Sequence, residues 1–408
     1  MIPNQSVPVP VREFTVTTGG TQSTLQVFQD LLAMITFSAL LLLSCCSLQD
    51  IKLPDTAGGF TYQDDGTCAA LSNRTLYWRT SHDTLHLHEV SLNHNLLGAR
   101  IRMRFLDTPL LGGVSVHEAW GQVVVLVPTV GSVHRLSFPH PSRLESTHDG
   151  SLLSVLAEAS AASAREHQHT LSWPSSTLLP SFACSHLTHE EEAIFVLGNS
   201  AGQLTVVKMS RVRGFTSVNQ LAAPSSVLGR VWTSLTSSLA TQERQDQPLS
   251  CAITSLGGLV AVAVCKDHKL RVWNLQSHDC VMASDLVALT AEAGRNLGPG
   301  AQGHRLHLVS EEGKEVMVAL HLCFHQHSQF LLVKLAITAG QIGLSPVSTV
   351  YCPDYDLVDF SVHDRQITAV WTTGEGDTIV RRTVPGGQVV QFDNNIKTLV
   401  VKNSYNQI

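Results

Sequence analysis

The sequence predicts an all-β fold, a β-propeller with WD-like blades into which a few helices are inserted. The chain has 408 residues, and from Gly58 onward it consists of short apolar stretches separated by turn residues, a pattern typical of strands and hairpins. The stretches come in groups of three or four, and the middle stretch of successive groups begins near residues 123, 193, 259, 315 and 366. Intervals of about 50 to 70 residues indicate propeller blades that carry insertions. Most of the strands follow one another without a helix-length segment between them, which disfavours a parallel α/β fold.

The groups of expected strands follow one another along the chain in six ranges: 58–92, 114–138, 182–209, 249–283, 304–337 and 357–384. In the second group, the turn Trp120-Gly121-Gln122 separates two strands. In the fourth group, Lys269 to Trp273 follows Asp267-His268 and resembles the third strand of a WD-type blade, although the Trp-Asp dipeptide is absent. We therefore expect Trp273 to be buried between the strands of its blade.

Two of the intervening segments have helical patterns. Ser151 to Glu166 is rich in alanine, and Ser225 to Ala240 places its large apolar residues on one stripe. Each helix either packs back on its own sheet or projects from the rim as a docking surface.

Composition excludes several classes of protein. Hydrophobic residues make up 43% of the chain and charged residues 15%, so there is ample apolar surface for a folded core and too little charge for a coiled coil. The net charge of −6 is opposite in sign to that of a protein that grips nucleic acid through its phosphates. The nine cysteines are odd in number and form no CxxC pair, which indicates reduced thiols in a cytosolic or nuclear compartment.

An apolar run of about 17 residues, Leu31 to Ser47, lies at the short end of the range for a membrane span. Three interpretations remain open: a membrane helix, a buried core helix, or a splice or intron insertion foreign to the parent fold. The last is favoured because Gln29-Asp30 recurs as Gln49-Asp50, so that excision of residues 31–50 leaves the flanking pattern undisturbed.

No motif predicts catalysis or a bound cofactor. Residues 198–202 match G-x-S-x-G, with Ser200 at its centre, but the alternating stretch that follows indicates a hairpin rather than the helix of a nucleophile elbow. Histidines cluster without a carboxylate or cysteine at a recognised zinc spacing, namely His82, His86, His88 and His94, and His321, His325 and His327. We predict that the protein is not an enzyme, with no catalytic, cofactor-binding or metal-binding residues and no cofactor.

Several long strings resemble, in order, the N-terminal region of the family of the 160-kDa nucleoporin. They are REFTV at 12–16, AGGFTY at 57–62, NRTLYWRTSHDTL at 73–85, SLNHNLLGARIRMRF at 91–105, GGVSVHE at 112–118, VHRLSFPHPSRL at 133–144 and CKDHKLRVWNLQSHDCVMASDL at 265–286. The resemblance covers roughly residues 11–29 and 51–383.

The resemblance implies a β-propeller of about seven blades that, in the family, continues into a long helical stack. It divides the chain into an N-terminal segment at 1–50, a propeller at 51–384 and a divergent tail at 385–408, with the helical stack missing. It also implies a structural scaffold of the Y-shaped nuclear pore module, located in the nuclear envelope, which docks other nucleoporins and supports pore assembly, mRNA export and protein transport. Small-molecule substrates, direct nucleic-acid binding and membrane contact are not expected. The alternative is a membrane-anchored interaction propeller that uses 31–47 as its span.

Overall fold

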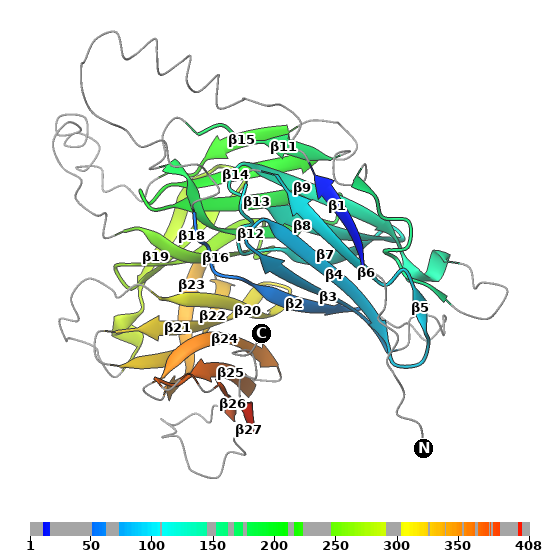
Figure 1. The fold of residues 1–408 in the computed structure, drawn as a ribbon. Coiled ribbons are helices and arrows are strands. Elements are labelled where there is room, and N and C mark those ends of the chain that lie inside the picture. The colour runs from blue at the N-terminus through cyan, green and yellow to red at the C-terminus, as the bar shows by residue number, and fades with distance from the viewer. Residues whose placement is uncertain are drawn as a thin grey trace, which may run out of the picture. The chain divides into compact units, whose positions relative to one another are not determined.

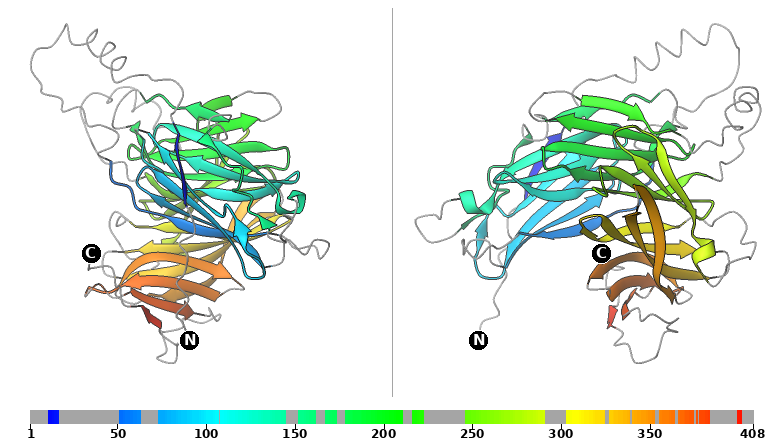
Figure 2. Two further views of the ribbon diagram at one scale, coloured as in Figure 1. Left: turned by 45° about the vertical axis from the view of Figure 1, so that its right-hand side comes forward. Right: turned by 180° about the vertical axis from the view of Figure 1, so that it is seen from behind.

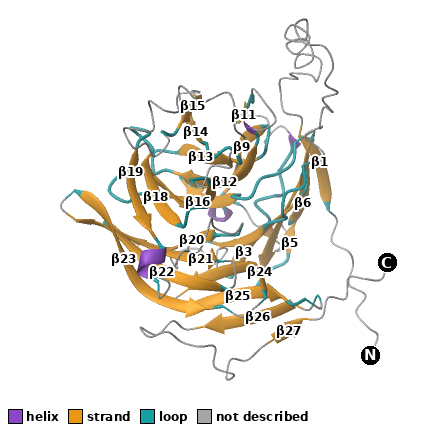
Figure 3. Cartoon of the chain, turned by 90° about the vertical axis from the view of Figure 1, so that its left-hand side faces the viewer, coloured by secondary structure: helices purple, strands orange, loops and turns teal. Residues whose placement is uncertain are grey.

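The computed structural model describes most of the chain between residues 11 and 401, and its regular structure is almost entirely β-strand (Figure 3). The described residues are 11–16, 51–62, 73–106, 108–144, 152–161, 167–173, 178–210, 216–222, 246–290, 303–324, 327–338, 340–352, 355–363, 366–374, 376, 378–383 and 399–401. They form two compact units, Met1–Phe195 with Val207–Ser217, and Val196–Val206 with Val218–Ile408.

The first sheet has five strands in the order β1-β6-β4-β3-β2 (Figure 1). Its strands are β1 (Arg12–Val16), β2 (Ala57–Thr61), β3 (Arg74–Ser81), β4 (Thr84–Ser91) and β6 (Arg100–Phe105). β1 pairs in parallel with β6, and the other neighbours are antiparallel. Burial alternates along β4, as expected for a strand with one face on a core.

The second and third sheets are four-stranded meanders. The second, in the order β11-β9-β8-β7, contains β7 (Ser115–Ala119), β8 (Gln122–Pro128), β9 (Ser132–Pro139) and β11 (Gln168–Thr170). The third contains β12 (Pro180–Leu187), β13 (Glu192–Asn199), β14 (Leu204–Ser210) and β15 (Thr216–Gln220) in chain order. β8 and β13 are apolar and buried on both faces, which explains why their sequences read as continuous valine- and leucine-rich runs.

Three further four-stranded sheets follow, each with its strands in chain order (Figure 2). The fourth sheet contains β16 (Pro248–Thr254), β17 (Val260–Cys265), β18 (Lys269–Asn274) and β19 (Cys280–Asp285). The fifth contains β20 (Arg305–Glu312), β21 (Glu315–Cys323), β22 (Ser328–Thr338) and β23 (Gln341–Tyr351). The sixth contains β24 (Asp356–His363), β25 (Gln366–Thr372), β26 (Thr378–Thr383) and β27 (Leu399–Val401). The side chains of β17 and β21 form one continuous hydrophobic core within the second unit.

Six sheets of this kind occur in the described residues, so the expectation of about seven blades is corrected to six. The residue pattern contains six groups of strands, and the seventh blade came from the family resemblance. The N-terminal strand does not begin another blade, because β1 joins the first sheet as a fifth strand.

The inserted helix expected at 151–166 is wrong over residues 152–160, whereas residue 161 is helical and residues 162–166 lie outside the described part of the chain. Residues 152–153 form β10 (Leu152–Leu153), which pairs in parallel with β5 (Leu96–Leu97), and a turn follows at 155–158. The other expected helix, at 225–240, lies outside the described residues. η2 (Pro141–Arg143) and η4 (Val287–Leu289) are short 3-10 turns.

A buried ion pair explains the conformation at 152–155. The Arg74 guanidinium donates to both oxygens of the Glu89 carboxylate, at 2.7 and 3.1 Å, and both side chains are almost fully buried. Glu89 Oε2 also accepts from the Ser154 hydroxyl at 2.7 Å and the Val155 amide at 2.9 Å. Arg74 Nη2 donates to the Leu153 carbonyl at 2.8 Å. These tertiary hydrogen bonds satisfy the segment in a non-helical conformation and override its alanine-rich helix propensity.

Candidate interaction surface

Ser200 lies in the tight turn between β13 and β14. The Asn199 side chain accepts from the Gln203 amide at 3.0 Å, and the Asn199 carbonyl accepts from the Gly202 amide at 3.1 Å, so the turn is closed by its own hydrogen bonds. The next element is strand β14, as the hairpin interpretation predicts, and the strand-to-helix bend of a nucleophile elbow is not formed.

His86 and His88 share one face of β4, as their spacing predicts. In the sheet register they lie opposite Arg102 and Arg100 of β6, and Arg100 Nε donates to His88 Nε2 at 3.1 Å. Burial lowers the pKa of both histidines, and the neighbouring guanidinium groups lower it further. This cationic surrounding opposes a metal cation at the two-histidine edge.

The other flagged histidines do not assemble a site in the described part of the chain. His82 and His94 lie in turns of the first sheet, His321 lies in β21, and His325 is outside the described residues. Among the residues that the structure describes, no three potential metal ligands of the His, Cys, Asp and Glu types come together.

A histidine pair that the sequence did not single out lies in the second unit. His268 Nδ1 and His304 Nε2 are 2.9 Å apart, and Phe324 packs against both rings. The Cys323 amide donates to His304 Nδ1 at 3.0 Å, so the His304 proton is on Nε2 and is donated to His268. Burial, with a smaller effect of the neighbouring histidines, lowers the pKa of His304 to about 3. His304 is therefore neutral, and its hydrogen bond joins the turn before β18 to the residue before β20.

The six described cysteines, at 184, 251, 265, 280, 323 and 352, are free thiols. Burial raises the pKa of Cys265 and of Cys352 to about 12, which leaves both as unreactive thiols at neutral pH.

Trp273 is buried in β18, the third strand of its sheet, with 2% of its surface exposed, as the sequence predicts. Its indole Nε1–H donates to the Ala222 carbonyl at 2.9 Å. Two residues earlier, the Arg271 guanidinium makes a two-pronged ion pair with Asp267 of the preceding turn, at 2.7 and 2.5 Å. These contacts are structural. The Trp273 bond fixes the segment after β15, and the Arg271 ion pair fixes the turn between β17 and β18.

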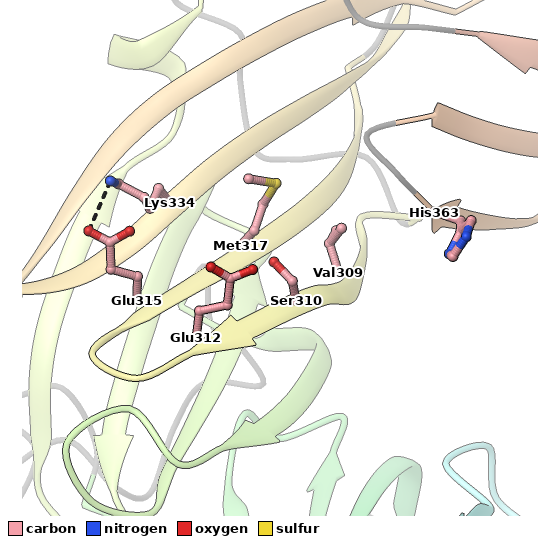
Figure 4. Close-up of a pocket in the computed structure, with 7 residues that line it drawn as sticks. All are labelled: Val309, Ser310, Glu312, Glu315, Met317, Lys334 and His363. Atoms are coloured by element: carbon pink, nitrogen blue, oxygen red, sulfur yellow. Dashed lines mark hydrogen bonds and ion pairs between the residues drawn. The ribbon is translucent and has the colours of Figure 1, made fainter. Parts of the chain in front are cut away.

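A surface pocket of about 410 Å³ lies over β20, β21 and β22 in the second unit (Figure 4). Seven residues line it: Val309, Ser310, Glu312, Glu315, Met317, Lys334 and His363. A register shift between Leu308 and Ser310 locally interrupts the β20 ladder at Val309, and Val309 and Met317 are partly buried against the core beneath. Figure 4 shows the ion pair between Lys334 and Glu315, 3.0 Å long, at one side and His363, from the end of β24, at the other.

The pocket has an apolar floor and a charged rim. Two carboxylates, Glu312 and Glu315, face one ammonium group, Lys334, so the rim carries an excess of negative charge. Such a surface can hold a side chain with an apolar stem and a positive end. This pocket is not visible in the sequence, because its lining comes from four strands and only the EEGKE turn between β20 and β21 is a local signal.

No helix in the part of the chain that the structure describes is long and apolar enough to cross a membrane. The apolar run at 31–47 lies outside that part.

Comparisons with known proteins give a consistent match. The model of the family "Nucleoporin Nup120/160, beta-propeller domain" matches residues 74–405. Nuclear pore complex protein Nup160 of Homo sapiens is 29% identical over 361 residues, which cover 85% of this chain and 24% of the human protein. The Mus musculus protein of the same name is 30% identical over 361 residues, covering 85% of this chain and 25% of the mouse protein.

The chain thus spans about a quarter of the length of these curated relatives. Among solved structures, the β-propeller domain of Cps50 (Swd1) from Myceliophteria thermophila superimposes with a TM-score of 0.45 and 11% identity, covering 78% of this chain and 82% of that domain.

Proposed function

Because the chain belongs to the nucleoporin Nup120/160 β-propeller family, we propose that it is a structural scaffold subunit of the nuclear pore complex, located at the nuclear envelope. It acts by docking other scaffold nucleoporins of the Y-shaped complex, and through that assembly it supports mRNA export and protein transport. The observation that carries this proposal is the family match over residues 74–405.

The described surface supports a docking role over a catalytic one. A propeller presents rigid sheets whose turns and edges differ from blade to blade, and such surfaces suit protein partners. The negatively charged pocket over β20 to β22 is suited to a lysine or arginine side chain of a partner, whose aliphatic stem would lie on Val309 and Met317. The docking role thus rests on surface shape and charge.

The proposal is tested by affinity capture from nuclear extract with the tagged full chain, followed by mass spectrometry. We expect other nucleoporins to be enriched over a tag-only control. Recovery of none by a chain with an intact β-sheet circular dichroism spectrum contradicts the scaffold role.

The pocket is tested separately with Glu312→Lys, which reverses the charge at its rim. We expect a several-fold lower recovery of at least one nucleoporin, because a positive side chain would then meet a positive rim. Glu190→Lys, an exposed acidic residue of the β12–β13 turn, is the matched control and should recover nucleoporins as the parent chain does. If Glu312→Lys and Glu190→Lys both recover nucleoporins as well as the parent chain does, the pocket is excluded as a docking element and the scaffold role is unaffected.

A further inference from the structure

The turn between β7 and β8 places a tryptophan where the backbone favours a small residue. Ala119 pairs with Gln122, so Trp120 and Gly121 are the two central residues, and their φ angles are +50° and +70°. Two positive φ angles in a two-residue hairpin define a type I′ turn, in which Asn-Gly is the preferred pair. A bulky residue with positive φ is rare because its side chain crowds the backbone. Tryptophan at position 120 therefore has a conformational cost that asparagine or glycine would not have.

The fold does not recover that cost through packing of the indole. Trp120 is 72% exposed, and within the described part of the chain its ring takes part in no hydrogen bond, aromatic contact or cation–π contact. Tyr77, another exposed aromatic residue, differs in this respect. Its ring lies over Gly59, where an added Cβ would be 3.3 Å from it, so it covers the bare backbone of the neighbouring strand.

The backbone of the turn that carries the indole is held by hydrogen bonds from two other residues. Arg143 Nη2 donates to the Trp120 carbonyl at 3.1 Å, and the His140 amide donates to the Gly121 carbonyl at 3.1 Å. A Cβ at Gly121 would lie 2.3 Å from Arg143 Nε, so the guanidinium is in direct contact with the turn. His140 in turn pairs with Glu118 of β7 at 3.2 Å. An aromatic side chain on a braced turn loses little conformational entropy when a partner covers it.

The charge next to the indole indicates the chemistry of the partner. Arg143 is exposed, and no carboxylate of the described residues forms an ion pair with it. Tryptophan and arginine are the residue types most enriched at the energetic centres of protein interfaces. A single guanidinium is too little positive charge for a nucleic-acid backbone, which is bound through many phosphate contacts.

We propose that Trp120, next to Arg143, is an anchor through which this propeller docks on another nucleoporin, one that presents an apolar pocket with a carboxylate at its rim. The proposal rests on the scaffold function proposed above and names the residue and partner chemistry of one docking contact. The indole fills the pocket, and the guanidinium, already fixed against the turn, meets the carboxylate.

The test replaces Trp120 with the residue that the turn itself prefers. Trp120→Asn removes the indole and suits a type I′ turn, so its melting temperature should equal or exceed that of the parent chain. Leu92→Asn is the matched control, since Leu92 is 81% exposed in another turn of the first unit. Trp120→Tyr keeps an aromatic ring. The probe is the set of nucleoporins that the unmodified full chain retains from nuclear extract, quantified by isotope-labelled mass spectrometry.

We expect Trp120→Asn to lower retention of at least one nucleoporin about tenfold or more, Trp120→Tyr to restore part of it, and Leu92→Asn to leave it unchanged. Photocrosslinking from Trp120→p-benzoylphenylalanine should then label that same nucleoporin directly.

Four other results overturn the anchor. If Trp120→Asn retains the nucleoporins fully, Trp120 is not an anchor, but the scaffold function is unaffected. If the unmodified chain retains no nucleoporin, both the anchor and the scaffold function are excluded. If the melting temperature of Trp120→Asn is lower than that of the parent chain, the indole stabilises the fold and is not free for a partner. Loss of binding to phosphatidylserine vesicles, with nucleoporin retention unchanged, makes it a membrane contact.

Discussion

The carboxylate of Glu89 connects three segments that are far apart in the chain. It accepts two hydrogen bonds from Arg74, one from Ser154 and one from Val155, and the two from the Arg74 guanidinium pair opposite charges. A buried ion pair of this kind contributes little net stability compared with an apolar replacement, but removal of one partner leaves an uncompensated charge. Its role in this fold is to fix the position of residues 153–155.

We predict that Glu89→Ala lowers the free energy of unfolding by about 3–5 kcal/mol, because the Arg74 guanidinium is then buried without a counter-ion. The measurement is urea unfolding followed by tryptophan fluorescence. The double variant Arg74→Met with Glu89→Leu should recover part of the loss, because it removes the uncompensated charge but leaves the Ser154 hydroxyl and the Val155 amide without their acceptor. A double variant no more stable than Glu89→Ala would show that the pair stabilises the fold through its charge itself.

Trp273 combines burial with one hydrogen bond, and the two contributions can be separated. We predict that Trp273→Ala costs about 3–5 kcal/mol, since it leaves a cavity between strands. Trp273→Phe keeps most of the packing and deprives the Ala222 carbonyl of its donor, at a cost of about 1–3 kcal/mol. Equilibrium unfolding of the two variants measures both values, and a loss below about 1 kcal/mol for Trp273→Ala would be incompatible with a buried indole.

Among the elements, strand β1 has the most unusual connection. It lies parallel to β6, and the Val16 carbonyl accepts from the Leu106 amide at 3.0 Å. The Arg12 side chain extends from β1 to the turn at 155–158, where Nη1 donates to the Ala157 carbonyl at 2.6 Å and Nη2 donates to the Leu156 carbonyl. β1 is therefore held both by its backbone and by one side chain.

We predict that Arg12→Ala weakens both contacts together. Hydrogen exchange, read by mass spectrometry, should become faster for the amides of Leu106 and Ala157, because local opening of an edge strand costs less once its side-chain anchor is lost. Leu87, in the interior strand β4, should keep its protection. Unchanged exchange at Leu106 would mean that backbone pairing alone retains β1.

The individual elements show which signals in the sequence are reliable. The group of strands expected at 249–283 forms the fourth sheet, whose strands span residues 248–285, because alternating or wholly apolar runs between short turns are local signals. The first part of the helix expected at 151–166 is not formed because Glu89, more than 60 residues earlier, binds the Ser154 hydroxyl and the Val155 amide. The turn at Trp120 could be located from its Trp-Gly dipeptide, whereas its bracing by Arg143 depends on a contact across 23 residues.

On the scale of the whole molecule, three histidines with strongly lowered pKa values contribute to the way in which stability depends on pH. Burial is the main cause that lowers the pKa of His117 and His321 to about 4 and that of His304 to about 3, from an ordinary value of 6.5. The folded chain therefore keeps them neutral at a pH at which the unfolded chain protonates them. Their contribution to stability is complete above pH 6.5 and is lost as the pH falls through the folded values.

We predict that the melting temperature falls steadily from pH 6.5 to about pH 4 and is insensitive to these groups above pH 7. Each histidine contributes at most about 1.4 kcal/mol per pH unit to this slope. His321→Phe, at a site already lined by Phe330 and Trp371, should make the decline shallower by up to one such increment. Calorimetric scans at several pH values test this, and parallel curves for the two proteins would show that His321 does not titrate on unfolding.

Gly113 lies in the loop before β7, and its carbonyl accepts from the Ser185 hydroxyl of β12 at 2.6 Å. Its φ angle is +93°, and a Cβ at this position would lie 2.2 Å from the Ala183 carbonyl oxygen. A single methyl group would thus have to displace backbone rather than a movable side chain. A substitution at residue 113 should consequently be judged as a folding defect first, even though glycine contributes no side chain to any binding surface.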